Sequence, residues 1–294
     1  MVFPMPHNEI VEHRYQLAVL FHRLVQQNGV NYSAFTASFL RQQFHELLGY
    51  PAHYIRSDED IKAAVELWCE DRVAAEEKYG PIGDWATHTV TDMSKLFSGR
   101  TEFNDNISCW NVSACTDMSN MFDGAQAFNQ PLEGWTVSAC LSMSGMFGGA
   151  VVFDQPLEGW DVSSCTDMSY MFIGARSFDQ PLEGWNVSSC TTMSTMFYDA
   201  RSFNQPLEGW NVSSCADMSN MFNGAISFNQ PLEGWDVSAC TDMRSMFYDA
   251  SSFNQPLGAW VLSSVTDMTD MFEGAEAFVQ DVESWPNWEG KEWE

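Results

Sequence analysis

Three kinds of potentially reactive side chain occur in this chain at a fixed spacing of 25 residues. Cysteines hold one position of the repeat, a pair of methionines another, and glutamates a third. Thiolates and thioethers bind soft metals and carboxylates bind hard cations, so each kind could in principle form a metal site. The glutamates are Glu133, Glu158, Glu183, Glu208 and Glu233, and the cysteines are Cys115, Cys140, Cys165, Cys190, Cys215 and Cys240.

The cysteine position carries valine near both ends of the array, at Val90 and Val265. A position that accepts Cys or Val within one chain is typical of a small buried apolar slot. Neighbouring copies would lie about 4.8 Å apart with parallel Cβ vectors, which is poor disulfide geometry. The chain has no C-x-x-C pair and no histidine among its central repeats. We therefore expect reduced packing cysteines and no metal site, with the methionines filling the interior.

The glutamates allow two interpretations. They form either a solvated edge whose like charges oppose sheet association, or a binding stripe for loosely held cations or a basic partner protein. No EF-hand loop or calcium-binding nonapeptide is present. Five carboxylates in register repel by about 1 kcal/mol per neighbouring pair even at the dielectric constant of water.

One unit positions all of these side chains, and eight copies of it follow one another without an insertion. Its consensus is close to F-N-Q-P-L-E-G-W-x-V-S-x-C-T-D-M-S-x-M-F-x-G-A. An unbroken period of this length predicts a solenoid, in which coils bury their apolar side chains against each other. Because one face is copied many times, a unique catalytic constellation has little room to form.

Within one copy, L-x-x-W-x-V-x-x-C follows the leucine-rich-repeat pattern. On a short strand, Trp185 and Val187 would point inward and Asn186 outward. A short helical or 3₁₀ turn would follow Cys190 and bury the methionines and phenylalanine beyond it. The outward position and the glutamates are our candidate interaction residues: Asn111, Asp161, Asn186, Asn211 and Asp236, with Glu133, Glu158, Glu183, Glu208 and Glu233.

The chain divides into three parts: a helical cap of about three helices over 1–80, the solenoid over 81–285, and a Trp/Glu-rich cap or tail over 286–294. Apolar periodicity predicts helices over 8–28 and 33–48. A third helix would begin at a Ser57 cap, bury Ile61, Val65, Trp68 and Val73, and end at 80–81. The five histidines of the first 53 residues are expected on helix surfaces. A separate functional domain is the alternative for the cap.

Charge restricts the class of partner. The 294 residues carry a formal net charge of −27, of which residues 1–80 contribute −4. Such a field repels nucleic acid and anionic membranes and favours cations or basic proteins. No segment has the pattern of a signal peptide or a membrane-spanning helix. We expect an intracellular location or one within an assembly, with a cell or particle surface as the alternative.

Residues 80–285 resemble the bacterial surface-protein repeat family of the BspA type, which includes mycoplasma proteins of unknown function. The resemblance is carried by the segments F-D-Q-P-L at 153–157, W-D-V-S at 160–163 and T-D-M-S-Y-M-F at 166–172, and by the leader residues Trp68, Ile82 and Trp85. It implies a leucine-rich-repeat-like solenoid, adhesion or protein–protein contact, and no catalytic residues. The family's valine is mostly cysteine here, and its export signal is not seen.

The sequence therefore predicts an α/β solenoid: a leucine-rich-repeat-like, right-handed coil with short parallel strands and short helical turns. The predicted function is non-enzymatic, as a structural or protein-binding subunit or linker of a larger assembly, with no cofactor and no catalytic residue. No nucleophile elbow, P-loop, H-E-x-x-H or dinucleotide-binding glycine pattern is present. An adhesin-like surface protein and a cation-binding acidic scaffold are the alternatives.

Overall fold

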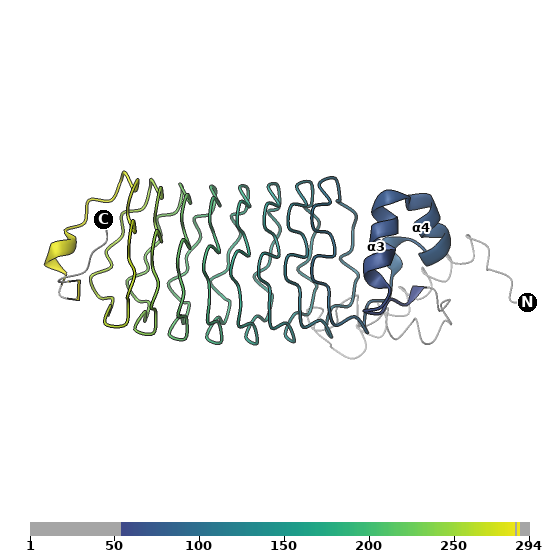
Figure 1. The fold of residues 1–294 in the computed structure, drawn as a ribbon, viewed down its shortest axis with the longest axis horizontal. Coiled ribbons are helices and arrows are strands. Elements are labelled where there is room, and N and C mark those ends of the chain that lie inside the picture. The colour runs from purple at the N-terminus through teal and green to yellow at the C-terminus, as the bar shows by residue number, and fades with distance from the viewer. Residues whose placement is uncertain (1–53, 286, 289–294) are drawn as a thin grey trace, which may run out of the picture.

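The computed structural model describes residues 54–285 together with 287 and 288. Within this part the chain forms a row of stacked coils with a helical segment at its N-terminal end (Figure 1). Isolated parallel bridges join residues 25 apart, so each coil comprises one repeat. The residues bridged at this spacing are Asp92, Asp117, Ser142, Asp167, Thr192, Asp217, Asp242 and Asp267, and a further parallel bridge joins Ile55 to Ala86. The helices predicted over 8–28 and 33–48 and the histidines among them lie outside the described residues.

Most backbone hydrogen bonds between coils run in one direction along the stack. The N–H groups of Met193, Thr195, Phe197 and Asp199 donate to carbonyl groups 24 residues further along the chain. The same four bonds recur at every junction from the first coil to the eighth, and at least one bond per junction runs the other way. Alternate donors take left-handed backbone angles, with φ of 61° at Thr195 and 52° at Asp199.

The inward and outward positions predicted around Trp185 are confirmed, but the backbone there differs from the prediction. Trp185 and Val187 are buried and Asn186 is exposed. The chain has no strand at these residues and turns without a helix after Cys190. A residue in the left-handed region, such as Thr195, cannot continue a helix. The side chain of Asn186 accepts a bond from the Ser188 N–H two residues on, which bends the chain. The leucine-rich-repeat-like class itself stays a prediction.

Stacked aromatic rings fill the interior of the coils. Trp160, Trp185 and Trp210 lie in parallel with ring centroids 6.5 and 6.4 Å apart, and Phe172 and Phe197 stack at 5.6 Å. Each indole N–H from Trp110 to Trp260 donates to a carbonyl 28 residues earlier, and the bond from Trp185 measures 2.9 Å. The leucine-to-tryptophan spacing of the motif therefore satisfies the one polar atom of each buried ring.

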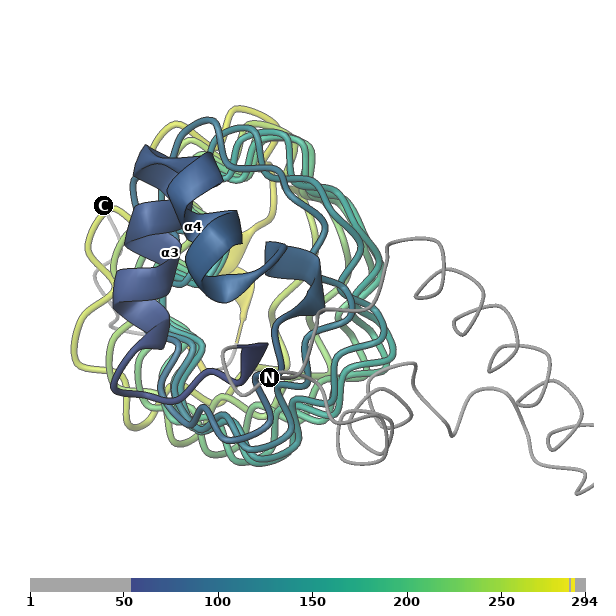
Figure 2. The same ribbon diagram turned by 90° about the vertical axis from the view of Figure 1, so that its right-hand side faces the viewer.

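Two helices cover the N-terminal end of the stack: α3 (Ile61–Glu70) and α4 (Arg72–Tyr79). Figure 2 shows them lying over the ends of the coils. Trp68 of α3 packs edge-on against Trp85, with ring centroids 5.9 Å apart. None of the helices in the described ranges is long and apolar enough to cross a lipid bilayer.

The predicted third helix is wrong in three details. It is two helices separated at Asp71, whose side chain accepts a bond from the Ala74 N–H and so starts a new helix. Val73, predicted to be buried, is 69% exposed because it lies just beyond this break. The first helix is preceded by Asp60 rather than capped by the Ser57 hydroxyl.

The C-terminal end of the stack has no α-helix over it in the described residues. A 3₁₀ turn, η4 (Val282–Ser284), follows the last coil, just as the 3₁₀ turn η3 (Ile82–Asp84) precedes the first coil at the other end. Trp288 is buried and stacks on Phe272 with ring centroids 6.1 Å apart. Trp285 lies edge-on to Trp288 at 5.0 Å. The described part of the predicted tail therefore packs onto the last coil.

Candidate functional site

The predicted glutamates lie on one exposed side of the stack, in five consecutive coils. Three residues after each glutamate comes the predicted outward position; Asp161, Asn186, Asn211 and Asp236 are exposed there, and Asn111 of the first coil is half-buried. The segments that run from the glutamine before P-L-E-G-W to the following cysteine, residues 130–140, 155–165, 180–190, 205–215 and 230–240, contain no Lys or Arg. We call these ten residues the acidic face: Asn111, Asp161, Asn186, Asn211, Asp236, Glu133, Glu158, Glu183, Glu208 and Glu233.

Each Asn or Asp of the acidic face is oriented by its own coil. The Asn186 Oδ1 atom accepts bonds from the Ser188 N–H at 3.2 Å and the Ser188 hydroxyl at 2.8 Å. Hydroxyl and backbone donors of the equivalent serines hold the pKa values of Asp161 and Asp236 below their ordinary value. Such a turn explains why the motif needs a serine two residues on. The five side chains are therefore displayed in a fixed orientation, and the carboxylates of Asp161 and Asp236 are favoured in their charged form.

A second column of Asn and Asp residues was not predicted to have a role. Asn204 Oδ1 accepts bonds from the next coil: the Asn229 N–H at 2.9 Å and the Gln230 side-chain amide at 3.1 Å. The same arrangement recurs along the stack, and the strict F-N-Q or F-D-Q triplet was its signal in the sequence. We call this column the amide ladder: Asn104, Asn129, Asp154, Asp179, Asn204, Asn229 and Asn254.

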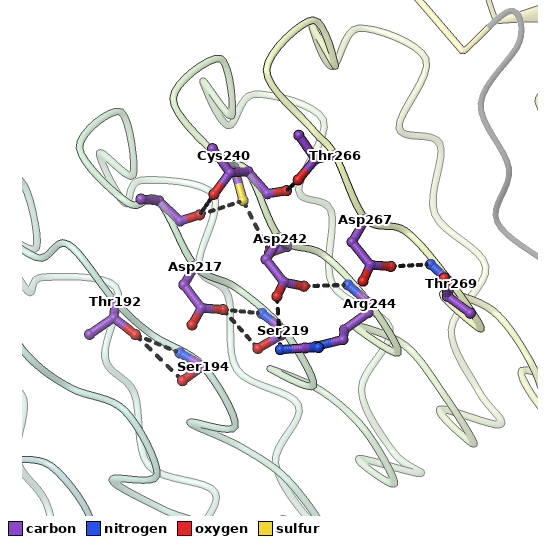
Figure 3. A network of polar contacts seen from close by, with 12 residues as sticks. Thr192, Ser194, Asp217, Ser219, Cys240, Asp242, Arg244, Thr266, Asp267 and Thr269 are labelled. Carbon is purple, nitrogen blue, oxygen red and sulfur yellow. Dashed lines mark hydrogen bonds and ion pairs between the residues drawn. The ribbon is translucent and has the colours of Figure 1, made fainter.

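The bridged column brings three carboxylates into consecutive coils, at Asp217, Asp242 and Asp267 (Figure 3). Asp217 accepts bonds from the backbone and hydroxyl of Ser219. Arg244 replaces that serine in the next coil and pairs with Asp242 at 3.0 Å. Partial burial, followed by the two neighbouring carboxylates, raises the pKa of Asp242. No group of three or more His, Cys, Asp or Glu in the described ranges could hold a metal ion.

The six cysteines of the column are free and fully buried. The Cys190 thiol donates to the Thr192 carbonyl at 3.1 Å, and burial raises the pKa of Cys190 to about 12. The reactive form of cysteine is the thiolate, which is suppressed here. The arrangement suits packing, as the sequence predicts, and not nucleophilic chemistry.

A groove of about 500 Å³ lies between the helical cap and the first coil. Arg72 lies over the Trp68 ring at 4.6 Å and pairs with Asp105, which also accepts the Trp68 indole N–H at 2.8 Å. Cys69 and Arg100 also line the groove. These contacts join the cap to the stack. Arg72, Trp68 and Asp105 bond to one another across the groove.

Taken together, the coils and their columns define a repeat protein built from stacked 25-residue units. The sequence profile of the family described as Mycoplasma protein of unknown function, DUF285, matches residues 70–185 and 175–285. These two tandem matches cover most of the chain, and the chain belongs to this family. No curated protein and no solved structure matches it.

Proposed function

We propose that this chain is a non-enzymatic protein-binding subunit or linker, of the leucine-rich-repeat-like solenoid class, that uses its acidic face to bind a basic partner protein. The observation that carries the proposal is the exposure of five glutamates in register along segments that contain no cation. A surface of this kind steers a positively charged partner and holds it through several charge pairs.

The acidic face suits a protein better than a metal ion. Each coil contributes one glutamate, joined by one aspartate in the coils of Asp161 and Asp236, whereas hard cations need several oxygen ligands around one point. A basic protein can instead match a row of separated charges with a row of its own. Loosely held cations screening the glutamates are the weaker candidate. The formal charge of −27 argues against nucleic acid as the partner.

The chain resembles BspA-type surface proteins in its repeat, which favours contact between proteins as its role. A location inside a cell or within an assembly is proposed with it, and an adhesin at a cell or particle surface is the alternative.

The test is affinity capture from the native source with the full chain and two triple variants. Glu158→Gln/Glu183→Gln/Glu208→Gln removes three charges from the acidic face. Glu102→Gln/Glu273→Gln/Glu276→Gln removes three exposed charges from other parts of the described chain and is the matched control. We expect a basic protein to be captured by the full chain and the control and lost by the first variant. Equal capture by both variants would overturn the proposal.

A further inference from the structure

One corner of the coils differs in chemistry from the rest of the surface. Roughly half a coil beyond the acidic face, the columns change residue from copy to copy, with Arg176, Arg201, Ile226 and Ser251 in one of them. Arg176 and Arg201 are 54% and 52% exposed. In the described coils beyond the first, the one other basic residue is Arg244, which lies in a different column.

The two arginines are held as a pair by one carboxylate. Arg176 bonds to Asp199 Oδ2 through Nε at 3.0 Å and Nη2 at 2.9 Å, and Arg201 Nε bonds to Asp199 Oδ1 at 2.6 Å. Asp199 takes a left-handed φ of 52° in a column that is mostly glycine. A non-glycine residue in this conformation costs of order 1 kcal/mol or more.

Three exposed side chains with apolar surface belong to the same coils as the arginine pair or to the next coil. Tyr198, next to Asp199, is 38% exposed, Tyr170 is 47% exposed and Ile226 is 42% exposed. Tyrosine and arginine are the residue types most enriched where protein interfaces gain their binding energy. The charges of Arg176, Arg201 and Asp199 leave one net positive charge at the corner of a strongly acidic protein.

We propose that this corner is a second interaction surface, and that it binds a protein segment with a carboxylate beside an aromatic or aliphatic side chain. The remaining N–H donors of the two guanidinium groups would hold the carboxylate, and Tyr198, Tyr170 and Ile226 would contact the apolar neighbour. One net positive charge suits one carboxylate. A phosphate dianion would meet repulsion from Asp199 and from the whole acidic chain.

The chain contains its own control for this surface. Two coils further on, Tyr248 and Asp249 repeat Tyr198 and Asp199, with Asp249 again left-handed at φ 51°. The arginine column there holds Ile226 and Ser251. The second Tyr-Asp pair therefore lacks the cations, and the proposal predicts that it contributes little to binding.

The test is panning of the full chain against a library of phage-displayed random dodecapeptides, followed by affinity measurement with the synthetic peptides selected. We expect acidic, aromatic-containing peptides. Arg176→Gln/Arg201→Gln and Tyr198→Ser should each weaken their binding about tenfold or more, whereas Arg244→Gln and Tyr248→Ser should change it less than about twofold. Circular dichroism melts establish that each variant is folded.

The other outcomes overturn the proposal. Selection of basic peptides alone would remove the corner as a binding surface while leaving the acidic face in place. Acidic peptides that bind the two sets of variants equally, or a library that yields no binder, would also contradict it. Because the acidic face is tested with different variants, the two proposals can fail separately.

Discussion

The amide ladder and the Asn/Asp positions of the acidic face are built from the same residue types at the same spacing, yet the stack uses them in opposite ways. Asn204 of the ladder accepts hydrogen bonds from the next coil, whereas Asn211 accepts them from Ser213 of its own coil. The neighbours decide the difference: a glutamine follows each ladder residue from Asn129 on, and a serine lies two residues after each Asn or Asp of the acidic face. Strict repetition therefore marks both the contacts that join coils and the side chains that are displayed.

The largest effect should come from breaking the ladder. Asn204→Ala removes the acceptor of the Asn229 N–H and leaves this partly buried donor without a partner, while the Gln230 amide keeps only its bond to the Asn204 carbonyl. We expect the free energy of unfolding to fall by about 1–3 kcal/mol, measured by urea denaturation. Asn204→Asp is the matched control, because the ladder already uses Asp154 and Asp179, and it should be close to neutral. A neutral Asn204→Ala would mean that the ladder does not hold coils together.

The glutamates of the acidic face should make stability depend on salt. Raising the NaCl concentration from about 20 to about 300 mM screens their mutual repulsion. A gain of about 1 kcal/mol would raise the Tm by about 2–4 °C in calorimetry. The variant Glu158→Gln/Glu183→Gln/Glu208→Gln should show a smaller rise. A Tm that does not move with salt contradicts the repulsion.

Replacing an Asn of the acidic face should lower the free energy of unfolding less than replacing an Asn of the amide ladder. Asn211→Ala removes bonds to the Ser213 N–H and hydroxyl, both of which can bond to water instead. We expect a loss within about 0.5 kcal/mol by urea denaturation. If Asn211→Ala and Asn204→Ala destabilise the chain equally, the distinction between display and attachment is wrong.

The smallest effect is the pH dependence of the face carboxylates. The pKa values of Asp161 and Asp236 are lowered by their serine bonds, so folding favours the charged form. Their contribution is present above the ordinary carboxyl pKa and is lost as pH falls through the lowered value. The variant Asp161→Asn/Asp236→Asn should therefore lose less stability than the wild type between about pH 5 and pH 3 in urea titrations. Identical pH profiles would contradict the shifts.

The sequence predicts burial better than it predicts backbone conformation. The interior positions of Trp185, Val187 and Cys190 follow from apolar spacing and are confirmed. The left-handed residues could not be found in the same way, because their column holds Lys95, Asn120, Tyr170 and Thr195, which share no propensity for positive φ. That conformation is imposed by pairing with the neighbouring coil, a tertiary effect. The amide ladder was missed for a related reason: the presence of Asn or Asp at a position does not show whether its side chain bonds within its own coil or to the next coil.

The arginine corner was missed because it is absent from the consensus. Arg176, Asp199 and Arg201 belong to different copies, and only the coil register brings them into contact. A consensus of the repeat does not contain residues that occur in only one or two copies, so it cannot show a contact between them.

The shared direction of the bonds between coils gives the stack an electrical polarity. Each peptide group carries a dipole of about 3.5 D, and aligned groups add as they do in a helix. Here the N–H groups point toward the C-terminal coil, which is the positive end, and the carbonyl groups of the first coil form the negative end under α3. Lys62 places its ammonium group there, 2.8 Å from Asp92. If two such stacks met by their C-terminal ends, N–H donors would face N–H donors, and by their N-terminal ends carbonyl acceptors would face acceptors. Further coils can therefore pair with the stack only in the orientation of the coils already present.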